Sequence, residues 1–353
     1  MKERDRNLDL IRTTALLLVI VTHFLDNTGL YEAYIEWPVR LAAGTIRQIS
    51  VCSVALFLIL TGYLHDGRRL SPRYYLGYLR IYETYLLCCA LTFLIRRTVQ
   101  HQPTDLAYMV GSTVNFYGCY YAWYLMMYTG LFLMIPFLNL AFDGLETKRQ
   151  QLVLIASFFA LSILPSILNN RIQLWSVWWK DLFPITYYYT GIFLRRYRPR
   201  VPARRAALVL LLMLAAFLIL ERLRFGRTED WVIGFSWYDR YETYFLSVAL
   251  FVLLLNVRLD DVPGFLLRAT EKISVLSLAA YLMSGIVDLT VYPMLKQAWP
   301  VTGRTILLLL PTALFVSAAS LLLAQLVAWA YKPVDRLVRG WLLRRFPALR
   351  ADG

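Results

Sequence analysis

Four ionisable residues share one face of the first apolar segment: Asp9, Arg12, His23 and Asp26. Residues 11 positions apart in an α-helix are separated by three full turns plus about 20°. Arg12 and His23 therefore project from the same side, about 16 Å apart along the helix axis. Asp9 lies one turn before Arg12, and Asp26 lies one turn after His23. Placing an ionisable group in hydrocarbon costs about 2.5 kcal/mol or more, so this polar stripe needs an explanation.

Histidine is the side chain best suited to proton transfer near neutral pH. The chain has three histidines. His65 and His101 fall in predicted loops, so His23 is the only one inside a predicted span. A lone histidine in a span can also serve structure alone, by bonding a neighbouring helix. The aligned Arg12 favours a ligand site, with an anionic part of an elongated ligand near Arg12 and a reactive end near His23.

The elements that carry these residues are predicted to be membrane helices. The chain is 59% hydrophobic with a mean hydropathy of +0.51, whereas soluble domains are about 45–50% apolar. The excess lies in runs of about 20 residues, the length that crosses a bilayer. We therefore predict an all-α polytopic membrane protein with about ten transmembrane helices and a single membrane domain over residues 1–353. The predicted spans are 9–27, 46–64, 77–95, 122–141, 151–168, 182–195, 206–221, 241–256, 272–294 and 305–331.

The distribution of Lys and Arg predicts the orientation of these spans. With an even number of spans, the basic loops before the first span, after the second, fourth and sixth, and after the last all lie on one side. That side is expected to be cytoplasmic, with both termini inside. The same rule explains most of the net charge of +14. Nucleic-acid binding is not expected, because no basic soluble module is present.

Cysteine usage points to neither a metal site nor a disulfide framework. The four cysteines are Cys52, Cys88, Cys89 and Cys119. Three of them fall inside apolar runs, and none has the spacing of metal ligands. We expect no bound metal.

Further residues allow a functional and a structural interpretation. Arg80 and Glu83 are three positions apart in a predicted span, so they could pair with each other or contact a ligand. Trp123 at a span end could contact substrate, although interface anchoring is the commoner role. The two longer outer loops are rich in aromatic residues, which suit either an interfacial belt or stacking on sugar rings. These are Tyr117, Tyr120, Tyr121, Trp231, Phe235, Trp237 and Tyr238.

The first span resembles that of the acyltransferase-3 family of membrane O-acyltransferases. Their signature is an Arg, ten residues and a His, usually after Arg-x-x-Asp-x-x-Arg. Here Arg6, Asp9, Arg12 and His23 have this spacing. Three later stretches are also similar to family patterns: Phe57 to Leu64 with Thr61-Gly62-Tyr63, Trp123-Tyr124-Leu125 with Pro136, and Tyr188-Tyr189-Thr190-Gly191.

The resemblance implies a reaction. The family moves an acyl group, usually acetyl, from cytoplasmic acetyl-CoA to a hydroxyl of an envelope glycan or a lipid-linked sugar. It implies a multi-pass protein of the bacterial cytoplasmic membrane, with acetyl-CoA as co-substrate. His23 would act as a base or as a covalent relay, and Arg12 would bind a CoA phosphate or the thioester arm.

Supporting roles follow from the same resemblance. Asp9 would orient Arg12, and Asp26 would fix the tautomer of His23. Tyr63 and Tyr82 are candidate donors to the oxyanion that forms as a thioester collapses. The chain departs from the family in two places. It has no Arg-x-x-Arg after the second span, and it has Ser284 where many members have a late-span histidine.

Two other classes of polytopic protein are considered: a transporter or flippase, and a polymerase or ligase of lipid-linked glycans. A carrier also has about ten spans with a few buried charges. The chain shows no inverted-repeat pattern, and its outer loops are modest in length. Neither alternative requires the Arg12–His23 spacing. The identity of the acceptor stays open, as do the choice between base and relay for His23 and the oligomeric state.

Overall fold

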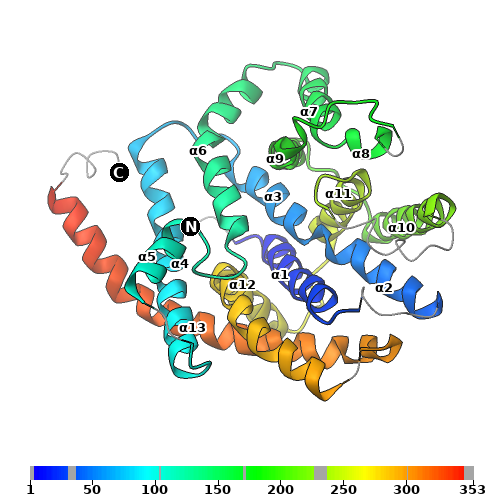
Figure 1. The fold of residues 1–353 in the computed structure, drawn as a ribbon. Coiled ribbons are helices and arrows are strands. Elements are labelled where there is room, and N and C mark those ends of the chain that lie inside the picture. The colour runs from blue at the N-terminus through cyan, green and yellow to red at the C-terminus, as the bar shows by residue number, and fades with distance from the viewer. Residues whose placement is uncertain are drawn as a thin grey trace. The chain divides into compact units, whose positions relative to one another are not determined.

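The computed structural model describes residues 4–30, 37–102, 105–169, 172–225, 237–299 and 301–345. Every regular element in these ranges is a helix (Figure 1), which confirms the all-α prediction. The helices form two compact units. The first contains Met1–Asp66, Ala141–Ser274 and Lys296–Ala313, and the second contains Gly67–Leu140, Val275–Leu295 and Leu314–Gly353.

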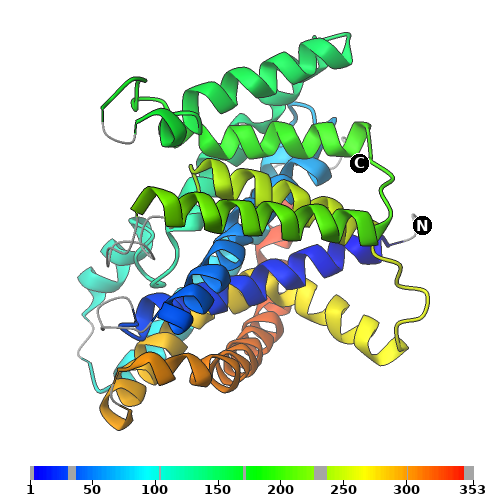
Figure 2. The ribbon, with the colours of Figure 1, turned by 90° about the vertical axis from the view of Figure 1, so that its right-hand side faces the viewer.

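The first unit is built around α3. This helix packs against α1, α9 and α11, and most of its side chains are buried. Figure 2 shows α1, α7, α9, α10 and α11 of this unit with their axes roughly parallel to one another. Their bounds, with those of the shorter helices, are α1 Arg6–Asn27, α2 Trp37–Ser50, α3 Cys52–His65, α7 Lys148–Ser162, α8 Pro165–Leu168, η1 Lys180–Leu182, α9 Phe183–Arg196, α10 Ala203–Phe225, α11 Tyr241–Asn256 and η4 Gly303–Leu308.

Two glycines bring α3 and α9 into backbone contact. A Cβ atom added to Gly62 would lie 2.0 Å from the carbonyl oxygen of Tyr188, and one added to Gly191 would lie 2.1 Å from the carbonyl oxygen of Ile59. Small residues at helix crossings allow this close approach in membrane proteins, where van der Waals packing drives association. The crossing fixes α3 and α9 at the turns that carry Tyr63 and Arg195.

The second unit contains α4 (Pro72–Thr98), α5 (Leu106–Val114), most of α6 (Trp123–Asp143) and most of α13 (Leu309–Arg345). Helix α12 (Gly264–Ala298) contributes to both units. The Ser71 hydroxyl caps α4 by accepting from the Tyr74 amide. The Tyr74 ring stacks on Phe132 of α6 at 4.4 Å between centroids, and its hydroxyl donates to the Phe132 carbonyl.

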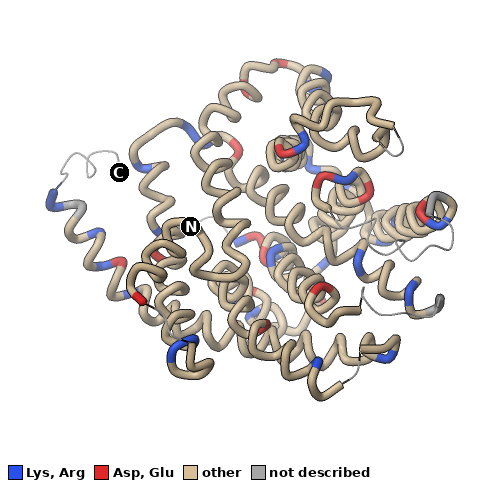
Figure 3. The backbone as a smooth tube through the Cα atoms, viewed as in Figure 1, with Lys and Arg blue, Asp and Glu red and all other residues tan. Residues whose placement is uncertain are grey.

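Within the described residues, seven helical stretches are long and apolar enough to cross a membrane. They correspond to α1, the α2–α3 stretch Val39–His65, α4, α6, the α10 stretch Ala203–Leu223, α12 and Gly303–Trp341. Figure 3 shows α6 without a charged residue until its last turn. The chain is a multi-pass membrane protein. Helices α7, α9 and α11 match three further predicted spans but have only 15, 14 and 16 residues. The count of ten and the orientation stay predictions.

Candidate active site

The start of α1 is tied to the end of α11. The Asp5 carboxylate caps α1 by accepting from the Asn7 amide. The Asn7 side-chain amide donates to the Leu254 carbonyl at 2.8 Å and to the Val257 carbonyl at 2.9 Å. These are carbonyls at the C-terminal end of α11, which the helix itself cannot satisfy. The contacts fix the position of the polar stripe that follows on α1.

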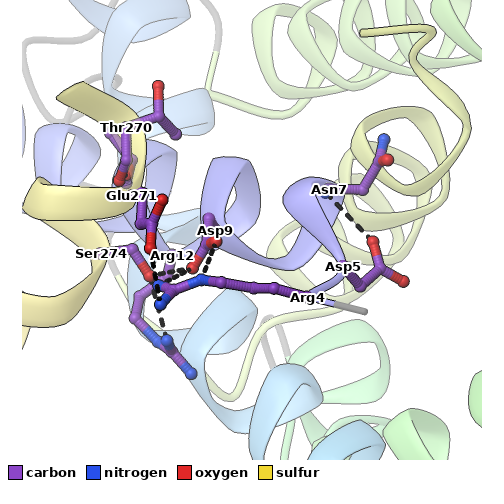
Figure 4. Close-up of polar contacts among 9 residues, drawn as sticks. Arg4, Asp5, Asn7, Asp9, Arg12, Thr270, Glu271 and Ser274 are labelled. Carbon is purple, nitrogen blue, oxygen red and sulfur yellow. Dashed lines mark hydrogen bonds and ion pairs between the residues drawn. The ribbon is translucent and has the colours of Figure 1, made fainter. Parts of the chain in front are cut away.

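One turn further, a polar network surrounds Arg12 (Figure 4). The Ser274 hydroxyl of α12 donates to Asp9 Oδ1 at 2.7 Å, and Arg12 Nη1 donates to Ser274 Oγ at 3.0 Å. Arg4 donates to both Asp9 oxygens, at 2.6 Å from Nε and 2.8 Å from Nη2. Asp9 and Ser274 are both buried. The structure thus brings Asp9 and Arg12 together through Ser274.

The second cation of this network also reaches α12. Arg4 Nη1 lies 3.1 Å from Glu271 Oε1, and its hydrogen bond to Asp9 raises the pKa of Arg4 above the usual value. The Thr13 hydroxyl donates to the Thr270 carbonyl at 3.0 Å, which adds a neutral link between α1 and α12. We call Arg4, Asp9, Arg12, Glu271 and Ser274 the α1 network. Arg4, Glu271 and Ser274 were not predicted as site residues.

Tyr63 lies at the same end of the first unit. Its ring is buried, 5.1 Å from the Arg195 guanidinium and 5.8 Å from the Phe251 ring centroid. Its hydroxyl is buried without a hydrogen-bond partner among the described residues. Such an atom carries a desolvation cost that a bound ligand can remove.

Ion pairs link the helix ends on this side of the first unit. Arg196 donates to Asp66 at 2.7 Å and also to Asp143. Arg198 Nη1 lies 3.6 Å from Asp5, the residue that caps α1. The start of α1 and the ends of α3 and α9 therefore meet here. His65 is the last residue of α3, where a loop was predicted.

His23 lies three turns along α1 from Arg12 and is buried. The side-chain amide of Asn27 donates to the backbone carbonyl of His23 at 2.8 Å. Asp26, which was expected to hold the His23 tautomer, forms an ion pair with Arg47 of α2. Tyr238 is close to this pair. Burial raises the pKa of Tyr238 to about 12, while the charge of Arg47 lowers it and that of Asp26 raises it.

Comparison with known proteins identifies the family. Residues 5–329 match the family model described as an acyltransferase domain, which is nearly the whole chain. The protein belongs to the acyltransferase-3 family. It is therefore a multi-pass membrane acyltransferase, and both Arg12 and His23 fall within the matched range. Neither the curated proteins nor the solved structures gave a significant match.

Three predicted substrate-binding residues of this acyltransferase lie in its second unit. Arg80 and Glu83 form no ion pair with each other within the described ranges. The Arg80 guanidinium lies 5.8 Å from the Tyr331 ring centroid, and Glu83 is buried with Oε2 lacking a hydrogen-bond partner in the described part of the chain. Trp123 begins α6 and is 40% exposed. The ring of the predicted donor Tyr82 stacks on Tyr78 and makes a tilted contact with Tyr85.

The aromatic residues of the longer loops fall partly within the described residues. Tyr121 donates to Asp288 at 2.9 Å and accepts at its carbonyl from the Tyr281 hydroxyl at 2.6 Å, so it holds α12 within the second unit. Tyr117 and Tyr120 are exposed. Trp231 and Phe235 lie outside the described residues.

Proposed function

We propose that this acyltransferase moves an acyl group, normally acetyl, from cytoplasmic acyl-CoA to a hydroxyl of an envelope or exported glycan. The acceptor would be a polysaccharide or a lipid-linked sugar, and the protein would lie in the bacterial cytoplasmic membrane. The observation that carries the proposal is the arrangement of α1. A cation held by the buried Ser274 and a buried histidine share one helix face, three turns apart, within an acyltransferase domain.

The Arg12 end suits the acyl donor. Acyl-CoA is an elongated molecule with phosphates at one end and the thioester at the other. Its negative charge is therefore confined to one end. A guanidinium matches phosphate oxygens with its planar fork of donors. Ser274 and Asp9 hold that fork in one orientation, which lowers the entropy lost on binding. Tyr63, expected from the sequence as an oxyanion donor, lies at this end instead, and we assign its hydroxyl, which lacks a hydrogen-bond partner among the described residues, to binding of the acyl donor.

The His23 end suits the chemical step. As a general base, His23 takes the proton of the acceptor hydroxyl while that oxygen attacks the thioester carbonyl. The carbon–sulfur bond then breaks, and the proton returns to the leaving CoA sulfur. As a relay, the His23 imidazole would attack the thioester carbonyl and release CoA as its thiol. The acceptor hydroxyl would then take the acyl group, breaking the carbon–nitrogen bond and returning its proton to the imidazole. Both routes are compatible with a histidine about 16 Å along the helix from the cation that holds the donor, because the ligand is elongated.

The surroundings of His23 support an acceptor site. Asp26 is half exposed and its partner Arg47 is buried, so a charged pair borders the end of α1. Tyr238 adds an aromatic ring beside them. Carboxylates and aromatic rings are suitable partners for sugar hydroxyls and ring faces. Arg80, Glu83 and Trp123 of the second unit stay predicted substrate contacts, separate from the site on α1.

The test compares envelope glycans by mass spectrometry from cells that express wild type, His23→Ala or no protein. We expect an acyl mass increment, 42 Da for acetyl, only with wild type. In parallel, purified protein in lipid nanodiscs receives acetyl-CoA labelled in the acetyl group. Loss of label from CoA only when an acceptor glycan is added supports transfer. A protein that inserts normally and leaves every glycan mass unchanged would contradict the proposal and favour transport.

A further inference from the structure

Two buried cysteines meet in the second unit, away from the α1 network. Cys89 lies on α4, and Cys119 lies in the segment between α5 and α6. Their sulfur atoms are 3.8 Å apart, although the residues are 30 positions apart in the sequence. Both side chains are almost fully buried. Among the described residues, no other pair of cysteine sulfurs is in contact.

The segment before Cys119 is pressed closely against α4. A Cβ atom added to Gly118 would lie 2.5 Å from Cys89 Sγ, so only glycine permits this approach. The Tyr85 hydroxyl of α4 donates to the Thr113 carbonyl at 2.9 Å, and its ring stacks on Phe116 at 5.2 Å. The position of Cys119 against α4 is therefore fixed by contacts other than the two sulfurs.

We propose that Cys89 and Cys119 form a disulfide in the mature membrane protein. The sulfurs must approach by less than 2 Å to reach the bond length of about 2.05 Å. Two thiols lose two protons and two electrons, and we assign the oxidant to the class of oxidised protein dithiols. One cysteine attacks the disulfide of the oxidant to give a mixed disulfide. The second cysteine then displaces the oxidant as its reduced dithiol.

The predicted orientation supplies the compartment that this chemistry requires. The distribution of Lys and Arg places the segment before α6 on the outer side of the membrane, where disulfides form and persist. Both thiols are buried once the unit has folded, so an oxidant cannot reach them there. We therefore expect oxidation during folding, before the segment closes over α4. The bond would tie the segment just before Trp123 covalently to α4.

Peptide mapping of the full-length wild type tests the proposal directly. Membranes are quenched with N-ethylmaleimide in denaturant, so that free thiols are blocked before any exchange. We expect a linked peptide pair that joins Cys89 to Cys119 and disappears on reduction. After reduction, a mass-tagged maleimide should add to two of the four cysteines. Blocking of all four thiols in the first step would overturn the proposal, as would a link through Cys88 or Cys52.

Variants give an independent readout. Cys89→Ser and Cys119→Ser should each abolish the reducible pair, whereas the neighbouring control Cys88→Ser should keep it. Dithiothreitol should lower the melting temperature of wild type and of Cys88→Ser in detergent, but not that of Cys119→Ser. An equal response of Cys119→Ser to dithiothreitol would count against the bond. These readouts do not use acyl transfer, so they stand or fall independently of the proposed function.

Discussion

The crossing of α3 and α9 allows the sharpest stability prediction. In Gly62→Ala, the new Cβ would lie 2.0 Å from the Tyr188 carbonyl oxygen, whereas ordinary van der Waals contact begins at 3.4 Å. The helices must therefore separate by more than about 1 Å at this point. The obstructing atom belongs to a helix backbone and cannot rotate away. We expect a loss near the upper end of the usual overpacking range, about 3 kcal/mol.

That loss corresponds to roughly a 100-fold increase in the unfolded-to-folded ratio. It can be measured by unfolding the full-length protein in mixed micelles with increasing sodium dodecyl sulfate. Gly77→Ala and Gly130→Ala are matched controls, because both positions are helical and exposed and nothing lies within 4 Å of the added atom. These controls should be neutral or slightly stabilising, since alanine is the better helix former. Unfolding of Gly62→Ala at the same fraction of sodium dodecyl sulfate as wild type would refute the predicted steric clash.

The remaining predictions concern the site on α1. His23→Ala should abolish glycan acylation while the protein still inserts, as measured by glycan mass spectrometry; normal acylation would rule out the catalytic role. Arg12→Ala should mainly raise the KM for the acyl donor in a nanodisc assay, and a change in acceptor KM alone would show that Arg12 is wrongly assigned. Ser274→Ala removes a hydrogen bond to a buried carboxylate, worth about 1.5–3 kcal/mol, so donor KM should rise by about 10-fold or more. Thr270→Ala is its control, because that hydroxyl bonds a carbonyl of its own helix; equal effects of the two changes would contradict the role of Ser274.

Much of the architecture follows from local sequence. Apolar runs of bilayer length coincide with helices, because each such run must satisfy its backbone internally. The spacing of Asp9 and Arg12 also sufficed to place them on one face, because helical periodicity is local. The predicted span 241–256 coincides with α11, whereas the predicted span 151–168 runs past Ser162, where α7 ends, since an apolar run does not reveal where a helix stops.

The sequence patterns could not predict which residues of distant helices contact the site residues. Ser274 is 262 residues from Arg12, and no periodicity links them. The spacing of Arg80 and Glu83 allowed an ion pair between them, but Arg80 contacts the ring of Tyr331 on α13 instead. Local spacing creates an opportunity for an ion pair, and the packing of another helix decides whether it forms.

The α1 network also constrains the order of events during biogenesis. The Ser274 hydroxyl that donates to Asp9 is synthesised 265 residues after it. At 5–20 residues per second, that delay is roughly 13–50 s. Throughout that delay, the Asp9 carboxylate has no hydrogen bond from α12. Arg4 lies close enough along the chain to pair with Asp9 at once. A local ion pair can therefore protect the carboxylate of a nascent span until its permanent partner has been synthesised.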